Sequence, residues 1–343
     1  MTNLAIQTTA KQALAIPTKD LSREDWLRLR HSGIGGSDIS AIMGFNPYKT
    51  AYDLYHDKIN DVVADAQSDA AYWGTILEGV VAKEYAMRND CKVQKVNYMI
   101  RHPEFDFALA NIDRAVINPS ISGNVRLKDG KLTTDKLLEV KTASEYMKNV
   151  WGDEASDQVP DNYNLQCQWY MGITGVDECD LALLLGGNKY RQYNIKFDAE
   201  LFEIMIDEAQ NFWVNHVLAR VEPTPTTLAN AKQKYATSNP DSVLNIAFDD
   251  DAVIAVVDRY IELKEQEKEL KGKLEQAQTD VINLIEDNEA LTIDGELVMT
   301  YKAQKGRETF DKKGCLKAYP ELAEKFAEFT KTGEVSRVLR VKS

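Results

Sequence analysis

The chain has 343 residues, of which 44% are hydrophobic and 28% charged, and its formal net charge is −13. This length predicts two domains, or one large domain with an appendage, and the apolar fraction excludes wholesale disorder. Apolar stretches such as 181–185 are too short to cross a bilayer, and residues 1–15 lack the pattern of a signal peptide. We therefore expect a cytoplasmic protein without a membrane partner.

Four cysteines stand far apart in the sequence, at Cys91, Cys167, Cys179 and Cys315. Zinc ribbons and iron–sulfur sites need closely spaced thiolates, so we expect reduced, structural cysteines and no iron–sulfur cluster. The excess of carboxylates argues against passive coating of nucleic acid. It suits a protein that holds divalent cations, and it does not exclude a positive groove, because local fields matter more than net charge.

The N-terminal part is predicted to be helical after a flexible lead-in over residues 1–20. Ser22-Arg23-Glu24-Asp25 resembles a capping box and predicts the start of a helix. The glycine-rich run 33–38 interrupts it, and a short helix is expected at 39–43. Apolar spacing predicts a longer helix over 73–87.

From Lys92 the apolar pattern changes towards a period of two, which indicates strands. Strands are expected at 92–101, 107–117, 137–142, 180–185 and 190–197. Residues 120–136 are expected to form a hairpin loop, and helices are expected at 162–173 and 199–221. This order predicts an α/β core domain over residues 21–221. Glu222-Pro223-Thr224-Pro225 signals a linker, which we place at 222–251.

Residues 252–343 are predicted to form a C-terminal appendage, with a helix to about 286 followed by a small basic α+β unit. On the helix, apolar residues alternate gaps of four and three, as in a coiled-coil seam: Leu270, Leu274, Ala277, Val281 and Leu284. Two short strands and a helix near 320–329 are expected to follow. Between Tyr301 and Lys317, six basic residues and interleaved aromatics stand against two acids. Such a segment can be a solvated helical face, and our hypothesis is that it contacts DNA or a partner protein.

The strand at 137–142 carries the most informative side chains. Because side chains alternate between faces, Glu139 and Lys141 point the same way, while Val140 packs into the core. A solvated face is the alternative interpretation for such a pair. Asp113 lies on the preceding strand, so its carboxylate can meet Glu139, and with the Val140 carbonyl they predict a site for Mg²⁺ or Mn²⁺. Lys141 would then offset negative charge at a scissile phosphate.

Two further residues are ambiguous by themselves. Glu78 lies on an amphipathic helix, where most acids face solvent, and Gln166 lies on the helix after Lys141, where a lone glutamine means little. The run 33–38 can be an ordinary turn with a helix cap. It can also be an anion-binding nest that uses the N–H groups of Gly35 and Gly36.

In the order in which they occur, five motifs resemble the YqaJ-type viral recombinase family, the phage lambda exonuclease family of the PD-(D/E)XK nuclease superfamily. They are Trp26-Leu27-Arg28-Leu29-Arg30 with Gly33–Asp38, then Gly74 with Glu78, Asp113, Glu139-Val140-Lys141, and Tyr163 with Gln166 and Gln168. The resemblance covers roughly residues 20–215. No proline precedes Asp113, which departs from the superfamily's name.

This resemblance implies a restriction-endonuclease-like core, with a mixed central sheet flanked by helices, and Mg²⁺-dependent hydrolysis of DNA. It assigns metal binding to Asp113 and Glu139, and it makes Glu78 the helix acid at the metal site. Lys141 matches the catalytic lysine, and Gln166 matches the glutamine that follows it. The resemblance assigns binding of the 5′-phosphate to Arg30 and Ser37. Arg28 is the alternative if the motif is aligned two residues earlier. A guanidinium and the N–H groups of Gly35 and Gly36 suit a phosphate.

The expected activity is 5′-to-3′ digestion of double-stranded DNA from a free 5′ end, which leaves 3′ tails for recombination. The resemblance implies two kinds of partner, a single-strand annealing protein and further copies of the chain arranged in a ring, in a phage or prophage setting. Two alternatives stay open. One is a structure-specific or restriction-like endonuclease, and the other is a non-catalytic DNA-binding scaffold, although buried clustered carboxylates without a cation would be costly.

Overall fold

The computed structural model describes residues 15–60, 68–154, 156–247, 250–331, 333 and 337–341. These residues form two compact units, one that ends at Lys234 and one that begins at Tyr235. The predicted nuclease domain, residues 21–221, lies within the first unit. The predicted linker, residues 222–251, is divided between the two units.

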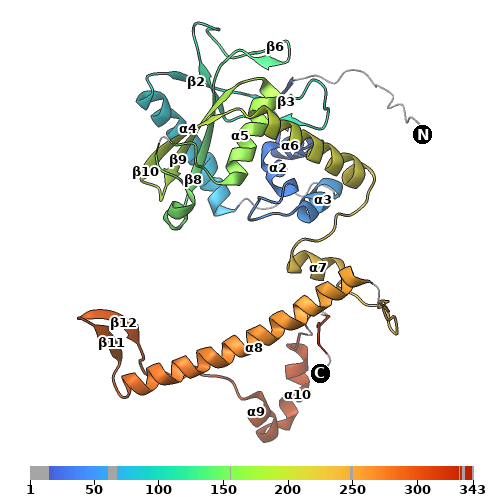
Figure 1. Cartoon of the computed structure of the whole chain (residues 1–343), viewed down its shortest axis with the longest axis vertical. Coiled ribbons are helices and arrows are strands. Elements are labelled where there is room, and N and C mark those ends of the chain that lie inside the picture. The colour runs from blue at the N-terminus through green and yellow to red at the C-terminus, as the bar shows by residue number, and fades with distance from the viewer. Residues whose placement is uncertain are drawn as a thin grey trace. The chain divides into compact units, whose positions relative to one another are not determined.

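The first unit is a mixed α/β structure (Figure 1). Its helices are α1 (Arg23–His31), α2 (Gly36–Ile42), α3 (Ala51–Ile59), α4 (Asp69–Arg88), the 3₁₀ segment η1 (Glu145–Val150), α5 (Asp161–Thr174), α6 (Ala199–Phe212), the π-helical segment η2 (Trp213–Leu218) and α7 (Leu228–Lys234). Its strands are β1 (Ala15–Pro17), β2 (Lys92–Lys95), β3 (Tyr98–Arg101), β4 (Leu109–Ala110), β5 (Arg114–Ile117), β6 (Leu127–Lys128), β7 (Lys131–Leu132), β8 (Leu137–Ala143), β9 (Glu178–Leu185) and β10 (Lys189–Lys196).

A five-stranded sheet in the order β10-β9-β8-β5-β2 forms the centre of this unit. β8 and β9 run parallel, with α5 in the chain between them, and the other neighbouring strands are antiparallel. Leu138 and Val140 of β8 pack with Val81 and Tyr85 of α4. The larger core, which includes Leu181 of β9, contains the apolar side chains of α5. The predicted class, a mixed sheet flanked by helices, is therefore confirmed.

Two predicted strands are each divided in the structure, because the chain passes from one sheet to another. Within 92–101, β2 pairs with β5 of the central sheet, whereas β3 pairs with β1 and β4 in a separate three-stranded sheet. Within 107–117, residues 111–113 separate β4 from β5. The end of the predicted lead-in is also ordered, because Ala15–Pro17 forms β1, while residues 1–14 lie outside the described part.

Local signals explain where several helices begin. The backbone N–H of Asp25 donates to the Ser22 hydroxyl, 3.1 Å away, and this cap starts α1 as predicted. The sequence interpretation missed α3, although Thr50 and Asp53 form a reciprocal cap at its start. The helix predicted over 199–221 is α6 followed by η2, which ends at Leu218.

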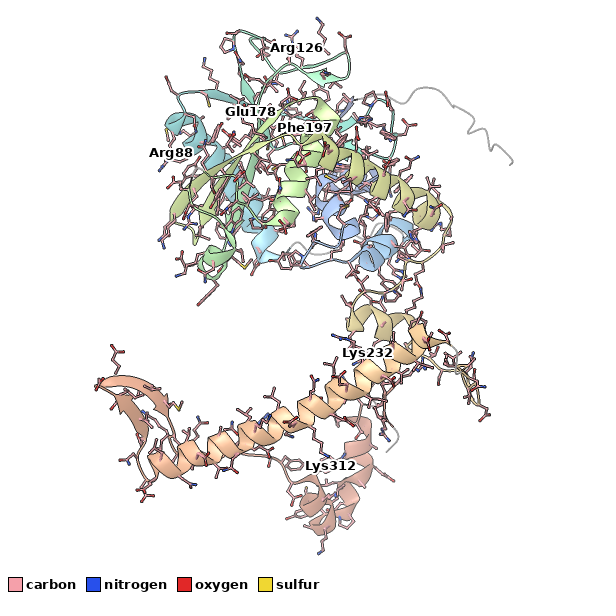
Figure 2. The ribbon with its side chains drawn as sticks, viewed as in Figure 1. Arg88, Arg126, Glu178, Phe197, Lys232 and Lys312 are labelled. Atoms are coloured by element: carbon pink, nitrogen blue, oxygen red, sulfur yellow. The ribbon has the colours of Figure 1, made fainter. Side chains whose placement is uncertain are left out.

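The second unit contains a long helix, a hairpin and short helices. Its elements are α8 (Asp251–Ile285), β11 (Ala290–Ile293), β12 (Glu296–Thr300), α9 (Lys312–Ala318), the 3₁₀ segment η3 (Pro320–Leu322) and α10 (Ala323–Glu328). The predicted long helix and two short strands are present. Lys312 of α9, labelled in Figure 2, is one of the exposed basic residues of this unit. Its ammonium nitrogen lies 5.9 Å from the centre of the Phe326 ring in α10. None of the described helices is both long and apolar enough to span a bilayer.

Candidate active site

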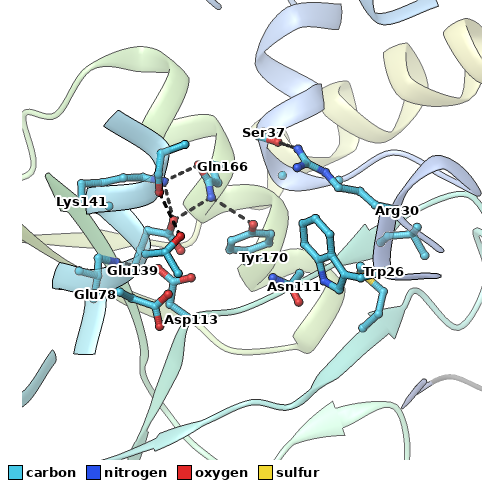
Figure 3. A pocket seen from close by; sticks show the side chains of 18 of the residues that line it. Trp26, Arg30, Ser37, Glu78, Asn111, Asp113, Glu139, Lys141, Gln166 and Tyr170 are labelled. Atoms are coloured by element: carbon cyan, nitrogen blue, oxygen red, sulfur yellow. Dashed lines mark hydrogen bonds and ion pairs between the residues drawn. The ribbon is translucent and has the colours of Figure 1, made fainter. Parts of the chain in front are cut away.

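A cavity of about 340 Å³ lies where β8, the segment before β5, and helices α1, α2, α4 and α5 meet. Its lining includes most of the residues singled out from the sequence: Arg30, Gly35, Gly36, Ser37, Glu78, Asp113, Glu139, Val140, Lys141 and Gln166. Figure 3 shows Arg30 and Ser37 on one side of this cavity, and the acidic side chains with Lys141 on the other. Residues up to 144 positions apart in the chain, Trp26 and Tyr170, therefore share one site.

β8 places Glu139 and Lys141 on the same face, opposite the α4-facing side chains. Glu139 is almost completely buried, with 3% of its surface exposed. The Lys141 ammonium nitrogen lies 2.7 Å from Glu139 Oε1. Burial alone would lower the pKa of Lys141, but the carboxylates of Glu139 and Asp113 raise it above its usual value. Lys141 is therefore held as a cation in this site.

Asp113 comes immediately before β5 and lies next to β8. Arg114 pairs with Leu138 in the antiparallel register, so the next position outward brings Asp113 opposite Glu139. Asp113 Oδ2 accepts a hydrogen bond from the backbone N–H of Val140 at 3.1 Å. Burial and the negative charge of Glu139 raise the pKa of Asp113 to about 8. The two carboxylates thus repel each other in spite of the nearby Lys141, and a further cation would relieve that repulsion.

Gln166 of α5 connects the members of the site. Its side-chain oxygen accepts from Lys141 at 3.0 Å, and its side-chain NH₂ donates to Glu139 Oε1 at 2.7 Å. The same NH₂ group lies 3.1 Å from the hydroxyl of Tyr170, one helical turn later. The second oxygen of Glu139, Oε2, is buried without a hydrogen-bond partner among the described residues. That oxygen is available to a further ligand.

Glu78 of α4 lies beside Asp113 (Figure 3), but its carboxylate is paired with the guanidinium of Arg114. In the described ranges, no three His, Cys, Asp or Glu side chains converge tightly enough to hold a metal ion as they stand. Asp113 and Glu139 therefore form the core of a possible metal site. Glu78 would have to exchange Arg114 for the metal in order to join them.

The residues predicted to hold a 5′-phosphate lie at the other end of the cavity. Arg30, in the last turn of α1, donates to the Ser37 hydroxyl, and its guanidinium lies over the Trp26 ring, 5.6 Å from the ring centre. Gly35 caps α2, and Gly36 is its first residue. A Cβ atom at Gly36 would lie 2.5 Å from the Tyr170 ring, so only glycine lets α2 approach α5 this closely.

Arg28 is not part of this cavity in the structure. It lies on the exposed side of α1, where it pairs with Glu24 at 2.5 Å and with Asp25 at 3.5 Å. Its side chain is 62% exposed. Of the two competing arginine registers, the geometry therefore brings only Arg30 towards the acidic residues.

A buried ion pair behind Arg30 is absent from the sequence interpretation. Lys58 of α3 lies 2.8 Å from Asp38 of α2, and both side chains are at most 5% exposed. Lys58 also donates to the backbone carbonyl of Arg30 at 3.1 Å. Burial alone would raise the pKa of Asp38, but Lys58 and Arg30 lower it to about 2. The pair fixes α2 and the end of α1, and recognising α3 from its Thr50–Asp53 cap would have pointed to it.

Three other lining residues, Trp26, Asn111 and Tyr170, were not assigned roles from the sequence. Burial raises the pKa of Tyr170 well above its usual value, so its hydroxyl stays protonated. Asn111 lies in the same short segment as Asp113, between β4 and β5. Single polar or aromatic residues at such positions carry no signal in one sequence, because only the fold brings them to the cavity.

Several known proteins are similar to this chain. The family model described as the YqaJ-like viral recombinase domain matches residues 25–177. The uncharacterized protein YqaJ of Bacillus subtilis is 32% identical over 289 residues, which cover 82% of this chain and 84% of that protein. The uncharacterized protein R354 of Acanthamoeba polyphaga mimivirus is 26% identical over 165 residues, which cover 48% of this chain and 29% of that protein.

Among solved structures, the alkaline exonuclease LHK-Exo from Laribacter hongkongensis is similar over 62% of this chain and 98% of its own. The TM-score is 0.43 and the sequence identity 19%. A phage-related exonuclease from Haemophilus somnus is similar over 57% of this chain and 99% of its own, with a TM-score of 0.37 and 14% identity.

Proposed function

Because the chain belongs to the YqaJ-like viral recombinase family, we propose that it is a Mg²⁺-dependent exonuclease that digests the 5′-ended strand of duplex DNA. The family assignment supports a phage-type nuclease, and the polarity, the metal and the DNA substrate are our proposal. One observation carries it. A single cavity contains an arginine–serine pair suited to a terminal phosphate and, across from it, two buried carboxylates with a lysine.

The residues present fit a hard divalent cation. Asp113 and Glu139 are neighbouring buried carboxylates, and Glu139 Oε2 has no hydrogen-bond partner in the described part of the chain. Mg²⁺ prefers such oxygen ligands, and Mn²⁺ commonly accepts them. We assign the metal to Asp113 and Glu139, with Glu78 and the Val140 carbonyl as further ligands. There it would polarise the scissile phosphate and activate a water molecule.

The chain's own residues perform the remaining tasks. Lys141 is cationic, so it can stabilise negative charge that develops on the phosphate, and it is poorly suited to take up a proton. Gln166 keeps Lys141 and Glu139 in fixed positions through its two hydrogen bonds. Arg30 and Ser37 would bind the 5′-phosphate, with two charge-assisted contacts that select a chain end over an internal position.

The proposal includes assembly and a biological setting. A ring of several copies would keep the enzyme on its DNA during successive cuts, and a single-strand annealing protein would take over the 3′ tails. Both follow from the resemblance to phage recombination nucleases, as does an origin in a phage or prophage that acts in the host cytoplasm.

Product analysis on end-labelled linear duplexes tests the proposal directly. We expect nucleotides to be released from the 5′ label first, 3′ tails to accumulate, and the rate to rise when a 5′-phosphate is present. Cleavage of covalently closed circular DNA would instead indicate the endonuclease alternative. Lys141→Ala should lower the rate roughly 10²- to 10³-fold, with DNA binding kept, because one such electrostatic contact is worth about 2.7–4 kcal/mol. Lys148→Ala, at an exposed lysine of η1, is the matched control.

A further inference from the structure

The long helix α8 carries an apolar stripe that is exposed along most of its length. Side chains project from the helix, and the other described elements of its unit leave most of them uncovered (Figure 2). Val256 is 70% exposed, Leu270 67% and Leu284 70%. Burying one such side chain is worth about 1.5–3 kcal/mol, so a stripe of this length favours a binding partner.

The stripe follows the heptad spacing of a coiled coil without interruption from residue 253 to residue 284. Gaps of three and four residues alternate, which defines the a positions Val253, Tyr260, Glu267, Leu274 and Val281. The d positions are Val256, Leu263, Leu270, Ala277 and Leu284. Leucine at most d positions and valine at two a positions suit a two-stranded pair. Glu267 is the one charged residue in the stripe.

The charges of α8 are segregated around this stripe. Its flanking e and g positions hold four of the five basic residues of the helix: Arg259, Lys264, Lys271 and Lys273. Asp280 is the only acid at these flanking positions. The remaining acidic residues, apart from Glu267, lie on the opposite side of the helix. In coiled coils, e and g charges decide which helix can pair.

This charge pattern disfavours pairing between two copies of α8. In a parallel pair, Arg259 of one copy would face Lys264 of the other, and the two Glu267 side chains would meet inside the seam. In an antiparallel pair, the basic e positions Lys264 and Lys271 would face each other. Repulsion of this kind is how natural coiled coils exclude wrong partners.

We propose that α8 pairs with an amphipathic helix of a different protein, one with apolar a and d positions, acidic e and g positions and a basic residue opposite Glu267. Within α8, Glu267 pairs with Lys264 on the helix surface, where both side chains are more than half exposed. Such exposed pairs contribute little, so a partner helix can replace this one. This inference does not depend on the proposed nuclease activity.

The end of the stripe gives the partner a defined boundary. Beyond Leu274, the stripe forms one wall of a cavity of about 530 Å³, whose other wall includes Met299 and Tyr301 at the end of β12. A partner helix that follows the stripe would reach this cavity with its last apolar residues. The hairpin would then limit how far the pairing extends.

A synthetic 35-residue helix tests the pairing with the full-length protein. The peptide has Leu at d, Val at a, Glu at every e and g, and one Lys opposite Glu267, and its like charges keep it from pairing with itself. The control peptide differs only in carrying Lys at e and g. We expect the acidic peptide to bind at least tenfold more tightly in fluorescence anisotropy. We expect Leu270→Asp with Leu274→Asp to abolish that binding without altering DNA cleavage.

A triple variant, with Lys264, Lys271 and Lys273 each changed to Glu, should reverse the preference between the peptides. Equal binding of both peptides, or binding that survives the Leu270→Asp and Leu274→Asp changes, would overturn the proposal. Light scattering of the protein without peptide gives a further test. If the Leu270→Asp and Leu274→Asp changes lowered its mass, a second copy of the chain would be the occupant of the stripe, and the proposal would be overturned. If the triple variant lost affinity for duplex DNA while the leucine variant kept it, the basic flanks would bind DNA phosphates and not an acidic helix.

Discussion

Arg28 and Arg30 are two residues apart on α1 and occupy opposite environments. Arg30 lies in the cavity against Ser37 and Trp26, whereas Arg28 pairs with Glu24 on the surface. Hydrogen bonds to charged groups contribute about 1.5–3 kcal/mol, so we expect Arg30→Ala to slow digestion of 5′-phosphorylated ends roughly 10- to 100-fold. Rates on 5′-hydroxyl ends should hardly change. Arg28→Ala is the matched control, and an equal loss in both variants would remove Arg30 from the phosphate site.

Asp113 gives the most direct test of metal binding that does not depend on activity. Mg²⁺ that binds only the folded protein stabilises it by about 2.7 kcal/mol at 100 times its Kd, which is about 5–10 °C in Tm for a domain of this size. We expect this rise for the natural protein in a thermal melt and not for Asp113→Asn. The variant should also be no less stable without metal, because it removes the repulsion with Glu139.

The control is Asp106→Asn, at an exposed position in the same unit, which should keep the full response to Mg²⁺. If Asp113→Asn kept that response as well, Asp113 would not be a metal ligand.

At the residue scale, strand alternation and sequence intervals predicted which side chains meet. Glu139 and Lys141 share a face of β8, and the interval from Asp113 allowed the return strand that places it alongside. The sequence did not predict that Arg114 would hold Glu78, or that Lys58 would lie behind Arg30. Both depend on distances between elements, which a periodic pattern does not specify.

Among the elements, the strongly periodic or well-capped ones were predicted, including α1, α4, α5, β9, β10 and α8. Errors occurred where the chain changes sheets. The sequence pattern of β2 and β3 is that of a single strand, yet the two pair with different strands. α3 was missed because its nine residues are short and give a weak helical pattern. Such elements acquire their stability from tertiary packing more than from local preference.

The contact between α2 and α3 predicts a specific dependence of stability on acid. Asp38 has its pKa lowered to about 2 by Lys58 and Arg30, so its contribution is complete above about pH 4 and is lost as the pH falls through 2. A shift of this size corresponds to about 2 kcal/mol. The measurement is the free energy of unfolding in urea at pH 4 and at pH 2. Relative to the double variant Asp38→Asn with Lys58→Met, the natural protein should lose about 2 kcal/mol of it between these two pH values.

Asp38→Asn alone is the informative companion to that measurement. It leaves Lys58 buried opposite a neutral amide and should cost about 3–5 kcal/mol at neutral pH, whereas the double variant removes both charges and should recover most of that loss. Parallel pH curves for the natural protein and the double variant would contradict the assigned ion pair.

At the scale of the whole molecule, the two units differ in how many of their apolar side chains are buried. The first unit contains the core and the candidate site, whereas α8 in the second unit has one fully buried residue, Ile285. An α/β core and a helical appendage were both predicted from the sequence. The position of the boundary between them was less evident, since Pro223 and Pro225 signal a linker that is followed by a helix belonging to the first unit.

That boundary gives a final prediction, about where the first unit ends. Asn230 of α7 is 4% exposed and donates to Asp53 at 2.7 Å, while its side-chain oxygen accepts from Thr50 at 2.9 Å. A chain that ends at Lys234 keeps these bonds, and one that ends at Val221 leaves Asp53 and Thr50 without them. Because each lost buried partner costs about 1–3 kcal/mol, the shorter chain should be less stable by at least about 2 kcal/mol in urea.

Asn230→Ala in the chain that ends at Lys234 separates this cause from a general effect of length. It should reproduce most of the loss, because it removes both hydrogen bonds and leaves the rest of α7 in place. The measurement is the urea midpoint by circular dichroism for the three proteins, with the cleavage rate on linear duplex as a second readout. Equal midpoints would place the end of the folded unit at Val221, and residues 222–234 would then belong to the linker that the sequence predicts.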